Sequence, residues 1–444
     1  MISFNLENYN KLGVAYPNTY DTINFIDKQK YAKLEQQYDP DGNGVSNTFL
    51  MLKKRTSKEY YTNILMSQSK ALVYSKHLFP TYKFIMPEAL LDDWLAIIDP
   101  HREGKRDHST HQPMTAYIVS QMLGCGDPAN ELSVDGRTLL DRCVDLLIDE
   151  NNQGTHYLRK YFCELYPKAK TMSISSTVKH KIAREVFCQT AVTSALFHDI
   201  GYPWQFTYGL SKSLLASDYV DNKQIERSAD DIKQRISGRL LNYPFHGYSE
   251  TSIAHQTFLW RSALDESLTA AFHNTHGFPG ALAFTYLTDI VRKFPQNLSF
   301  EEAICQFIID WAAVGIMMHD MPRQCRGNSN TPPRPQFRLS ADVDPLSCLI
   351  AMSDILEEFN RPRSVFESEE KSVNVKYTYP CIETSLDVVG DELCIKYLYE
   401  DEKLVAANRK SREDEVNEYF NYSDRFINLE ALGIKTVKCV VAKK

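Results

Sequence analysis

Apolar residues recur at three- and four-residue spacing through most of the segment from 101 to 365. The spacing is clear in HQPMTAYIVSQML, IAREVFCQTAVTSALF, SETSIAHQTFLWRSAL, EEAICQFIIDWAAVGIMM and PLSCLIAMSDILEEF. A side chain returns to the same face of an α-helix every 3.6 residues, so this pattern predicts helices that bury one face. The alternation typical of strands is nearly absent there. We therefore expect a helical core over 101–365.

The two ends of the chain carry different patterns. Residues 1–100 mix polar stretches with helical spacing, as in ALLDDWLAII, which predicts a helical N-terminal extension. After 366, β-branched and aromatic residues alternate in short runs such as ELCIKYLYE and KTVKCVVAKK, which predicts strands. A helical stretch near 411–430 lies between these runs. We expect a mainly α protein with a small α/β C-terminal subdomain of three or four strands over 366–444.

One segment of the N-terminal extension has the spacing of a calcium-binding loop. In DPDGNGVSNTFL, acidic and amide side chains fall at the first, third and fifth positions, followed by a glycine at the sixth. The twelfth position should be a bidentate Glu but is Leu50. A plain turn between helices is therefore favoured.

Composition and charge narrow the classes of function. The chain has 43% hydrophobic and 24% charged residues, as in an ordinary globular protein. A net charge of −7 and a pI near 6.0 argue against a surface that neutralises many nucleic-acid phosphates. Neither a membrane-spanning apolar run nor a secretory signal is apparent, so no membrane partner is expected. The 10 cysteines are scattered without a C-x-x-C pair, which predicts reduced thiols and a cytoplasmic location.

Two His-Asp dipeptides occur, and the context of the first favours chemistry. In AVTSALFHDIGYPW an apolar helix runs directly into His198 and Asp199 and is stopped by the following Gly and Pro. At the end of a helix, an imidazole and a neighbouring carboxylate can both lean onto one cation. Alternatively, His198 could cap the C-terminus of its helix, where positive charge is stabilised.

Two further segments carry polar residues in apolar surroundings. In RDHSTHQPMTAYIVSQMLG, His108 and His111 are three residues apart and share one face at the start of a helix. In PLSCLIAMSDILEEFNRPR, Asp354 interrupts an otherwise apolar helix. A carboxylate buried in such a helix requires a metal or another cation as its partner.

The order of these motifs resembles the HD (histidine-aspartate) superfamily of metal-dependent phosphohydrolases, over roughly 101–365. The resemblance implies an HD-type helical bundle core and four protein ligands for a first metal ion, namely His111, His198, Asp199 and Asp354. Two imidazoles and two carboxylates suit Mn, Fe, Mg, Zn, Ni or Co better than a metal that prefers thiolates.

Two more segments resemble a subset of that superfamily that holds two ions. FHGYSETSIA places His246 before a Gly and a Ser, and AAVGIMMHD places His319 at the end of a helix. The resemblance implies that both are metal ligands and that Asp199 bridges the two ions, so that Asp199, His246 and His319 are the expected catalytic residues. With one ion, the two histidines would contact the phosphate or protonate the leaving group.

The spacing of the motifs does not decide which of the histidines in the middle of the chain are metal ligands. The intervals from the first histidine to the His-Asp pair and from that pair to His246 are longer than in compact members of the superfamily. His273 and His276, in AFHNTHGFPG, therefore remain alternatives to His246 and His319.

Candidate substrate-binding residues lie beside these motifs. Arg361 follows the Asp354 helix, and Arg323 lies with Arg326 in a Pro-rich segment, where a guanidinium fork could bind phosphate oxygens. Tyr202, after the His-Asp pair, could stack on a nucleobase. A fold-stabilising role for Arg361 and a packing role for Tyr202 are the alternatives.

The resemblance implies hydrolysis of a phosphate ester, as a phosphomonoesterase or phosphodiesterase, through a metal-activated water. The expected substrate is a small phosphorylated molecule, such as a nucleotide or nucleotide-like signal. A di-iron oxygenase on the same fold and a non-catalytic nucleotide-binding sensor or scaffold are the alternatives. The substrate, the identity of the metal and the oligomeric state stay open.

Overall fold

The structure is a computed structural model, and part of the chain is described in it. The described residues are 1–5, 8, 108–124, 131–199, 201, 276–277, 280–281, 284–285, 295–320, 339–358, 363–369, 372–378, 381–422 and 425–444. The calcium-like segment and most of the expected N-terminal helical extension lie outside these residues.

The chain divides into two compact units, each built from stretches that are distant in sequence. The sheet unit comprises Met1–Thr138, Met352–Asn417 and Thr436–Lys444. The helical unit comprises Leu139–Ala351 and Glu418–Lys435. The division passes through one continuous helix, α18 (Pro345–Leu356).

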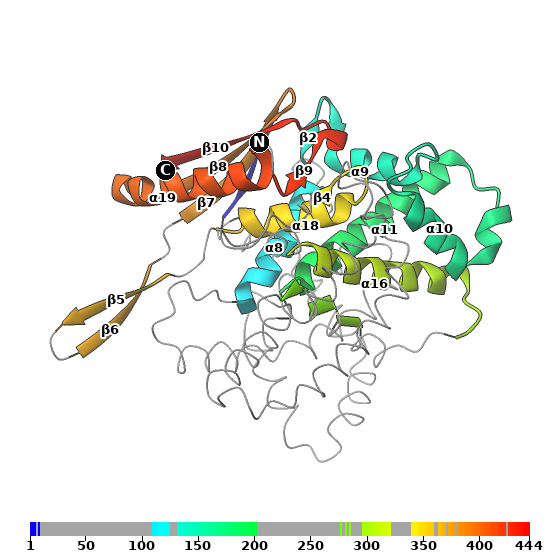
Figure 1. Cartoon of the computed structure of the whole chain (residues 1–444), viewed down its shortest axis with the longest axis horizontal. Helices are drawn as coiled ribbons and strands as arrows, with labels where there is room; N and C mark the ends of the chain where they lie inside the picture. Colours follow the sequence, from blue (N-terminus) through cyan, green and yellow to red (C-terminus); the bar gives the residue numbers. More distant parts are fainter. Residues whose placement is uncertain are drawn as a thin grey trace, which may run out of the picture. The chain divides into compact units, whose positions relative to one another are not determined.

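The sheet unit is organised around four strands in the order β1-β7-β8-β10 (Figure 1). Their bounds are Ile2–Phe4, Cys381–Val389, Glu392–Tyr399 and Thr436–Lys443. Three of the strands are antiparallel neighbours, and β10 pairs with β8 in parallel. In β8, Leu393, Ile395 and Tyr397 alternate with less buried residues, so one face of the strand enters the core.

The helix α19 (Glu402–Val416) connects β8 to the last part of the chain and packs along β10 and β8 (Figure 1). Asp401 accepts a hydrogen bond from the Leu404 amide at 2.8 Å and caps the start of this helix. The helix therefore begins earlier than the 411–430 stretch expected from the sequence. That expectation was wrong in its bounds because it took no account of the cap.

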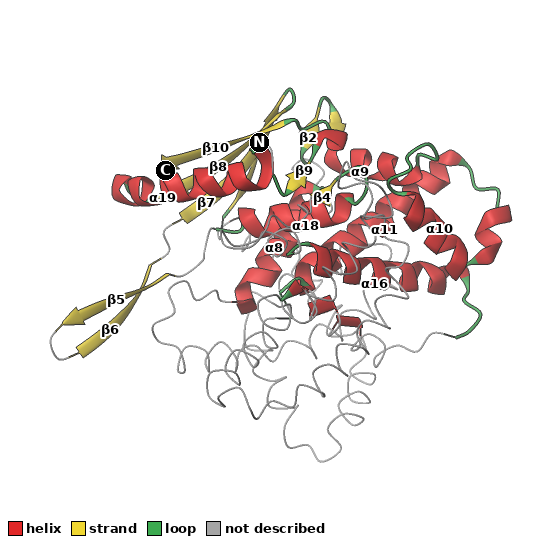
Figure 2. Cartoon of the chain, viewed as in Figure 1, coloured by secondary structure: helices red, strands yellow, loops and turns green. Residues whose placement is uncertain are grey.

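The sheet unit contains shorter pieces as well. The strands β5 (Arg363–Glu369) and β6 (Ser372–Thr378) form an antiparallel hairpin of their own (Figure 2). The strands β2 (Ser133–Val134) and β3 (Arg137–Thr138) are joined by Asp135 and Gly136, both with positive φ. Two consecutive residues of that kind form a tight hairpin turn whose twist matches the strands.

The first residues of the chain are a strand and not part of a helix. Ile2–Phe4 pairs antiparallel with β7, and the ring of Phe4 contacts Tyr117 edge-on at 6.1 Å between centroids. Tyr117 belongs to α8 (His108–Met122), which carries His111 near its start. The sheet and α8 therefore share one core.

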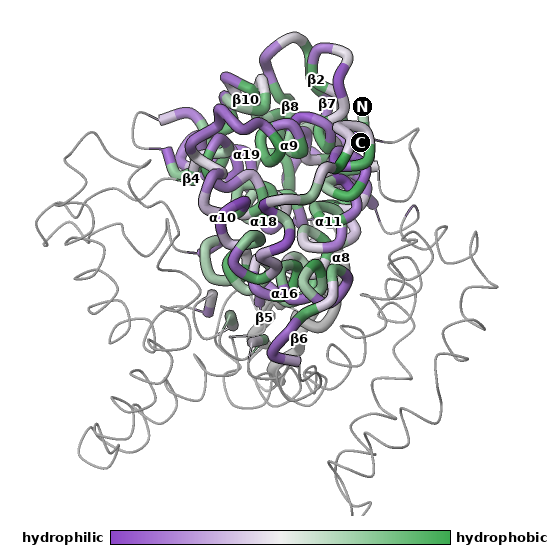
Figure 3. The backbone as a smooth tube through the Cα atoms, turned by 90° about the vertical axis from the view of Figure 1, so that its right-hand side faces the viewer, coloured by the Kyte–Doolittle hydropathy of each residue, from purple (hydrophilic) through white to green (hydrophobic). Residues whose placement is uncertain are grey.

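The helical unit contains α9 (Leu139–Ile148), α10 (His156–Leu165), α11 (Ser176–Phe197), α16 (Phe300–Met318) and the first part of α18. Shorter elements complete it: η2 (Pro167–Thr171), η5 (Glu430–Leu432) and the parallel pair β4 (Leu339–Ser340) and β9 (Ile427–Asn428). The segment Asn417–Asn421 forms a π-helical turn at the division between the units. Apolar residues dominate α16 and α18 (Figure 3).

The helices α11 and α16 pack closely along their last turns. The rings of Phe187 and Trp311 are in contact, with 5.7 Å between their centroids. Ser194 Oγ donates to the Ala312 carbonyl at 3.2 Å. A Cβ on Gly315 would lie 2.8 Å from Ser194 Oγ, so a side chain at this position would displace the Ser194 hydroxyl from its hydrogen bond. The close contact fixes the relative register of the two helices one turn before each of them ends.

Among the described residues, no helix combines the length and the apolar character needed to cross a membrane.

A capping box holds the start of α16. Ser299 Oγ accepts from the Glu302 amide at 3.2 Å, and the Glu302 carboxylate accepts from the Ser299 amide at 2.8 Å. We expect Ser299→Ala to lower the free energy of unfolding by about 1 kcal/mol, because the helix loses a capping acceptor. Urea denaturation measures the change. Gln296→Ala, at an exposed position of the same loop, is the control, and equal stability of the two variants would contradict the assigned cap.

Candidate metal centre

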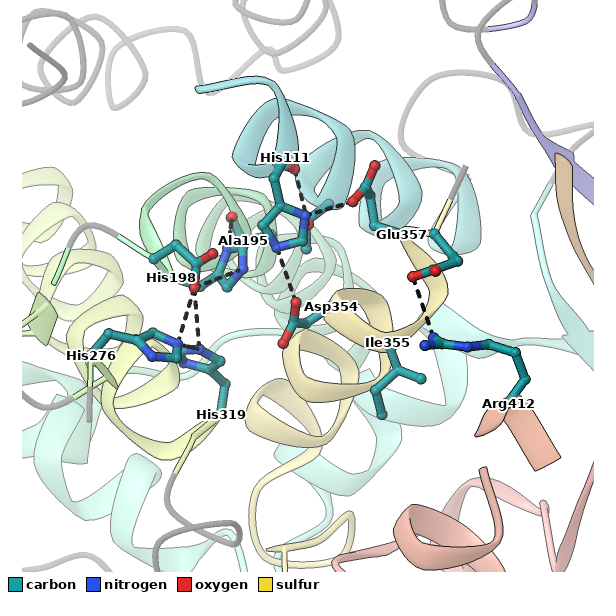
Figure 4. A network of polar contacts seen from close by, with 12 residues as sticks. His111, Ala195, His198, His276, His319, Asp354, Ile355, Glu357 and Arg412 are labelled. Carbon is teal, nitrogen blue, oxygen red and sulfur yellow. Dashed lines mark hydrogen bonds and ion pairs between the residues drawn. The ribbon is translucent and has the colours of Figure 1, made fainter. Parts of the chain in front are cut away.

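Three imidazole rings and one carboxylate meet in the helical unit. His198 and His319 directly follow α11 and α16, and His276 comes from a short described stretch between these helices in sequence. Their Nε2 atoms lie 3.3 Å (His198), 3.1 Å (His276) and 3.9 Å (His319) from Asp199 Oδ1. All four residues are buried. Figure 4 shows the rings of His276 and His319 beside each other, with 5.1 Å between their centroids.

The protons of these rings are assigned by the partners of Nδ1. His198 Nδ1 lies 2.7 Å from the Ala195 carbonyl, and His319 Nδ1 lies 2.6 Å from the Ile316 carbonyl. A carbonyl can only accept, so in both neutral rings Nδ1 carries the hydrogen. Each histidine thus donates to the carbonyl three residues earlier, at the end of its own helix. In both rings the lone pair is then on Nε2, the nitrogen that lies near Asp199 Oδ1.

His276 is held by the second His-Asp dipeptide. Asp320 Oδ2 lies 3.4 Å from His276 Nδ1 and accepts from the His276 amide at 3.4 Å. The Asp320 carboxylate thus lies on the Nδ1 side of the ring, and His276 Nε2 lies 3.1 Å from His319 Nε2. A carboxylate behind a metal-binding imidazole orients the ring and raises its basicity.

The distances from Asp199 Oδ1 to the Nε2 atoms of His198 and His276 match those between neighbouring ligand atoms of one divalent ion, and the 3.9 Å distance to His319 Nε2 is longer. Neighbouring donors around an ion, with bonds of about 2.1 Å in octahedral or tetrahedral geometry, lie roughly 3.0–3.4 Å apart. The donor atoms of His198, Asp199 and His319 all lie within 4.8 Å of one another. Buried His and Asp groups at metal-binding distance are thus present in the helical unit.

Burial favours the neutral form of His319. Burial, followed by the neighbouring rings of His198 and His276, lowers the pKa of His319 to about 4. A ring that stays neutral at pH 7 keeps its Nε2 lone pair available as a metal ligand.

Two glycines bring the His276 stretch against both His-Asp pairs. A Cβ on Gly201 would lie 1.9 Å from the His276 carbonyl oxygen. A Cβ on Gly277 would lie 2.9 Å from the Met317 carbonyl oxygen and 3.1 Å from Asp320 Cβ. Both contacts involve backbone that a side chain would displace. The Gly after the first His-Asp pair therefore serves close approach as well as the end of α11.

A second polar cluster lies in the sheet unit. His111 Nε2 is 3.0 Å from Asp354 Oδ1, and His111 Nδ1 is 2.7 Å from Glu357 Oε2 (Figure 4). The side chains of His111 and Glu357 are almost fully buried. Two of the expected ligands of the first metal, His111 and Asp354, thus lie side by side within this unit.

The expected site residues thus fall into three groups. His198, Asp199 and His319 lie together, and His276, an alternative on sequence grounds, lies with them. His111 and Asp354 lie together in the other unit, and the expectation that all four first-metal ligands hold one ion stays a prediction. The remaining candidates lie outside the described residues: His246, His273, Arg361, Arg323, Arg326 and Tyr202.

The sequence interpretation missed two carboxylates in these clusters, Asp320 and Glu357. A signal existed for each of them. Asp320 belongs to the second His-Asp dipeptide, and Glu357 follows Asp354 by three residues, a spacing that shares one helix face.

Comparison of the chain with protein-family models, curated proteins and solved structures finds no match. The likeness to the HD superfamily rests on the quoted motifs alone.

The lowered pKa of His319 predicts how stability depends on pH in metal-free protein. As pH falls from about 6.5, an unfolded chain binds a proton on this ring, whereas the folded chain does so only near pH 4. The free energy of unfolding should therefore fall with pH across this interval, and His319→Gln should reduce the slope. Urea denaturation in the presence of a chelator measures it. His156→Gln, at an exposed position, is the control, and identical slopes for the wild type and His319→Gln would contradict the assignment.

Proposed function

We propose that this chain is a divalent-metal-dependent phosphohydrolase with an HD-type helical core, acting on a phosphate ester. The observation that carries the proposal is the convergence of three Nε2 atoms on the Asp199 carboxylate. Lone pairs and a carboxylate oxygen repel one another at these distances unless a positive charge lies between them. A proton is a poor candidate for that charge at His319, whose pKa is about 4. A metal cation fits better.

The described residues suit the tasks of such a centre. His198, His276 and His319 would hold a divalent ion through Nε2, and Asp199 would bind it through Oδ1. A divalent ion held there lowers the pKa of a bound water and polarises a phosphoryl oxygen. Asp320 and the carbonyls of Ala195 and Ile316 keep the Nδ1 protons in place, so the rings enter the reaction already oriented.

The type of reaction rests on the resemblance to the HD superfamily together with this donor set. Imidazoles and a carboxylate without thiolates suit the metals used in phosphoryl hydrolysis, such as Mn, Zn or Mg. A nucleotide or nucleotide-like ester is the proposed substrate. Arg323, Arg361 and Tyr202 stay predictions as substrate-binding residues.

Replacement of Asp199 tests the centre. We expect Asp199→Asn to lower both bound metal and phosphate release by about 100-fold or more, because the ion loses its anionic ligand. Elemental analysis and a phosphate-release screen over nucleoside mono-, di- and triphosphates and cyclic nucleotides measure the two effects.

Asp310→Asn is the matched control for loss of a buried carboxylate. Asp310 is buried in α16, where Tyr161 and Gln306 donate hydrogen bonds to it, and it takes no part in the cluster. This variant is expected to lose stability but to keep metal and activity. Full retention of both by Asp199→Asn would overturn the proposal.

The metal requirement separates hydrolysis from the other functions that the same fold could serve. We expect phosphate release with Mn²⁺ or Mg²⁺ under nitrogen, without uptake of oxygen. Product formation that needs both iron and oxygen would instead indicate a di-iron oxygenase. Recovery of every nucleotide unchanged after long incubation with metal would indicate a non-catalytic binding protein.

A further inference from the structure

One helix presents a carboxylate to each ring nitrogen of His111. Asp354 lies in the last turn of α18, and Glu357 extends that turn, with its amide donating to the Ser353 carbonyl at 3.1 Å. Asp354 Oδ1 is 3.0 Å from Nε2, and Glu357 Oε2 is 2.7 Å from Nδ1 (Figure 4). All of these residues belong to the sheet unit.

The two contacts cannot both be ordinary hydrogen bonds while the ring is neutral. A neutral imidazole has one N–H and one lone pair, and a carboxylate only accepts. One nitrogen of the neutral ring therefore directs its lone pair at a carboxylate oxygen, an arrangement that becomes favourable when the nitrogen takes up a proton or when a cation binds both atoms.

Three observations assign the hydrogen to Nδ1. The Glu357 contact is the shorter one, and the Glu357 side chain is 2% exposed against 13% for Asp354, so Glu357 has the greater need of a donor. The Thr115 hydroxyl lies 3.5 Å from Nδ1, but it donates to the His111 carbonyl at 3.1 Å. Thr115 can therefore only accept from Nδ1.

We propose that Glu357 is a positioning residue that fixes the His111 proton on Nδ1 and directs Nε2, beside Asp354 Oδ1, at a divalent cation. The inference of a bound cation rests on the proposed function, whereas the assignment of the proton to Nδ1 does not. The 3.0 Å between Nε2 and Oδ1 is about the separation of neighbouring donors on one ion with bonds of about 2.1 Å.

The α/β part of the sheet unit braces the turn that carries Glu357. Tyr397 of β8 donates from its hydroxyl to the Ile355 carbonyl at 3.3 Å. Glu358, next to Glu357, forms an ion pair with Arg412 of α19 at 3.3 Å, and Arg412 also pairs with Glu415 at 2.6 Å. The residues on either side of Glu357 are thereby held by β8 and α19, which limits the freedom of Glu357 to leave the ring.

The Glu357→Gln variant of the full chain tests the inference through the His111 tautomer. A glutamine amide can donate to Nδ1, which allows the hydrogen to move to Nε2 and bond to Asp354. Long-range ¹H–¹⁵N spectra of protein labelled with ¹⁵N-histidine report the tautomer in metal-free samples, at a pH where these spectra show the ring to be neutral. The His111 signals are identified by their loss in His111→Gln.

We expect the Nδ1–H tautomer in the wild type and a shift toward Nε2–H in Glu357→Gln. We also expect the affinity for Zn²⁺, measured by competition with a chelating dye, to fall about 10- to 100-fold, as for other carboxylates behind a ligating histidine.

Glu358→Gln is the matched control, because Glu358 is a buried neighbour of Glu357 that forms an ion pair with Arg412. This variant should lose stability but keep the wild-type tautomer and Zn²⁺ affinity. An Nε2–H tautomer in the wild type, or equal loss of affinity in the two variants, would overturn the role of Glu357. A wild type with the Nδ1–H tautomer that binds no divalent cation would overturn the proposed function and leave the assignment of the proton standing.

Discussion

The close approach of α11 and α16 at Ser194 and Gly315 is the contact on which the candidate centre depends. Because residue 315 has no side chain, Ser194 reaches the backbone of α16, and the two helices are held in register one turn before they end. Each helix then ends on a histidine that donates Nδ1–H to the carbonyl three residues earlier. The two helix ends share this local geometry, and the contact at Ser194 and Gly315 places them side by side. His198 and His319 therefore point toward the same place.

The buried cluster at that point would be unfavourable without a compensating charge. Desolvation disfavours the protonated ring of His319, so this ring supplies no positive charge to the cluster near pH 7. A cation that bound the folded protein alone would stabilise it by mass action. Metal sites commonly hold several lone pairs close together, which is unfavourable without the ion. The reason is that the ligands must be deprotonated before the ion binds.

The sheet unit supports its own histidine in a different way. His111 is clamped by two carboxylates from α18, and the turn after α18 is in turn held by Tyr397 and Arg412. The α/β part of the chain thus contributes to the position of a candidate ligand without supplying one. The C-terminal subdomain is thus connected to the candidate ligand His111 through the turn after α18, which its strands and helix would not suggest by themselves.

Helical spacing and the cost of buried polar groups were enough to predict several features from the sequence. They indicated the helices that became α8, α11, α16 and α18, and the strands β8 and β10. They also singled out His198 and Asp199, because a polar residue at the end of an apolar helix stands out against its local pattern, whereas His319 followed from the resemblance to the HD superfamily. The pairing of His111 with Asp354 followed from the resemblance to a known order of motifs.

Tertiary structure decided what local pattern does not record. The sequence left four middle histidines open, and His276 is distinguished by backbone contacts at Gly201 and Gly277 with residues distant in the chain. Glu357 reads as an ordinary charged helix end until it is found against a ring 246 positions away. The strand at Ile2–Phe4 exists through its pairing with β7. Periodicity reports which side of a segment is buried, whereas convergence on one point depends on how closely separate segments pack, and that distance is set by partners far away in the sequence.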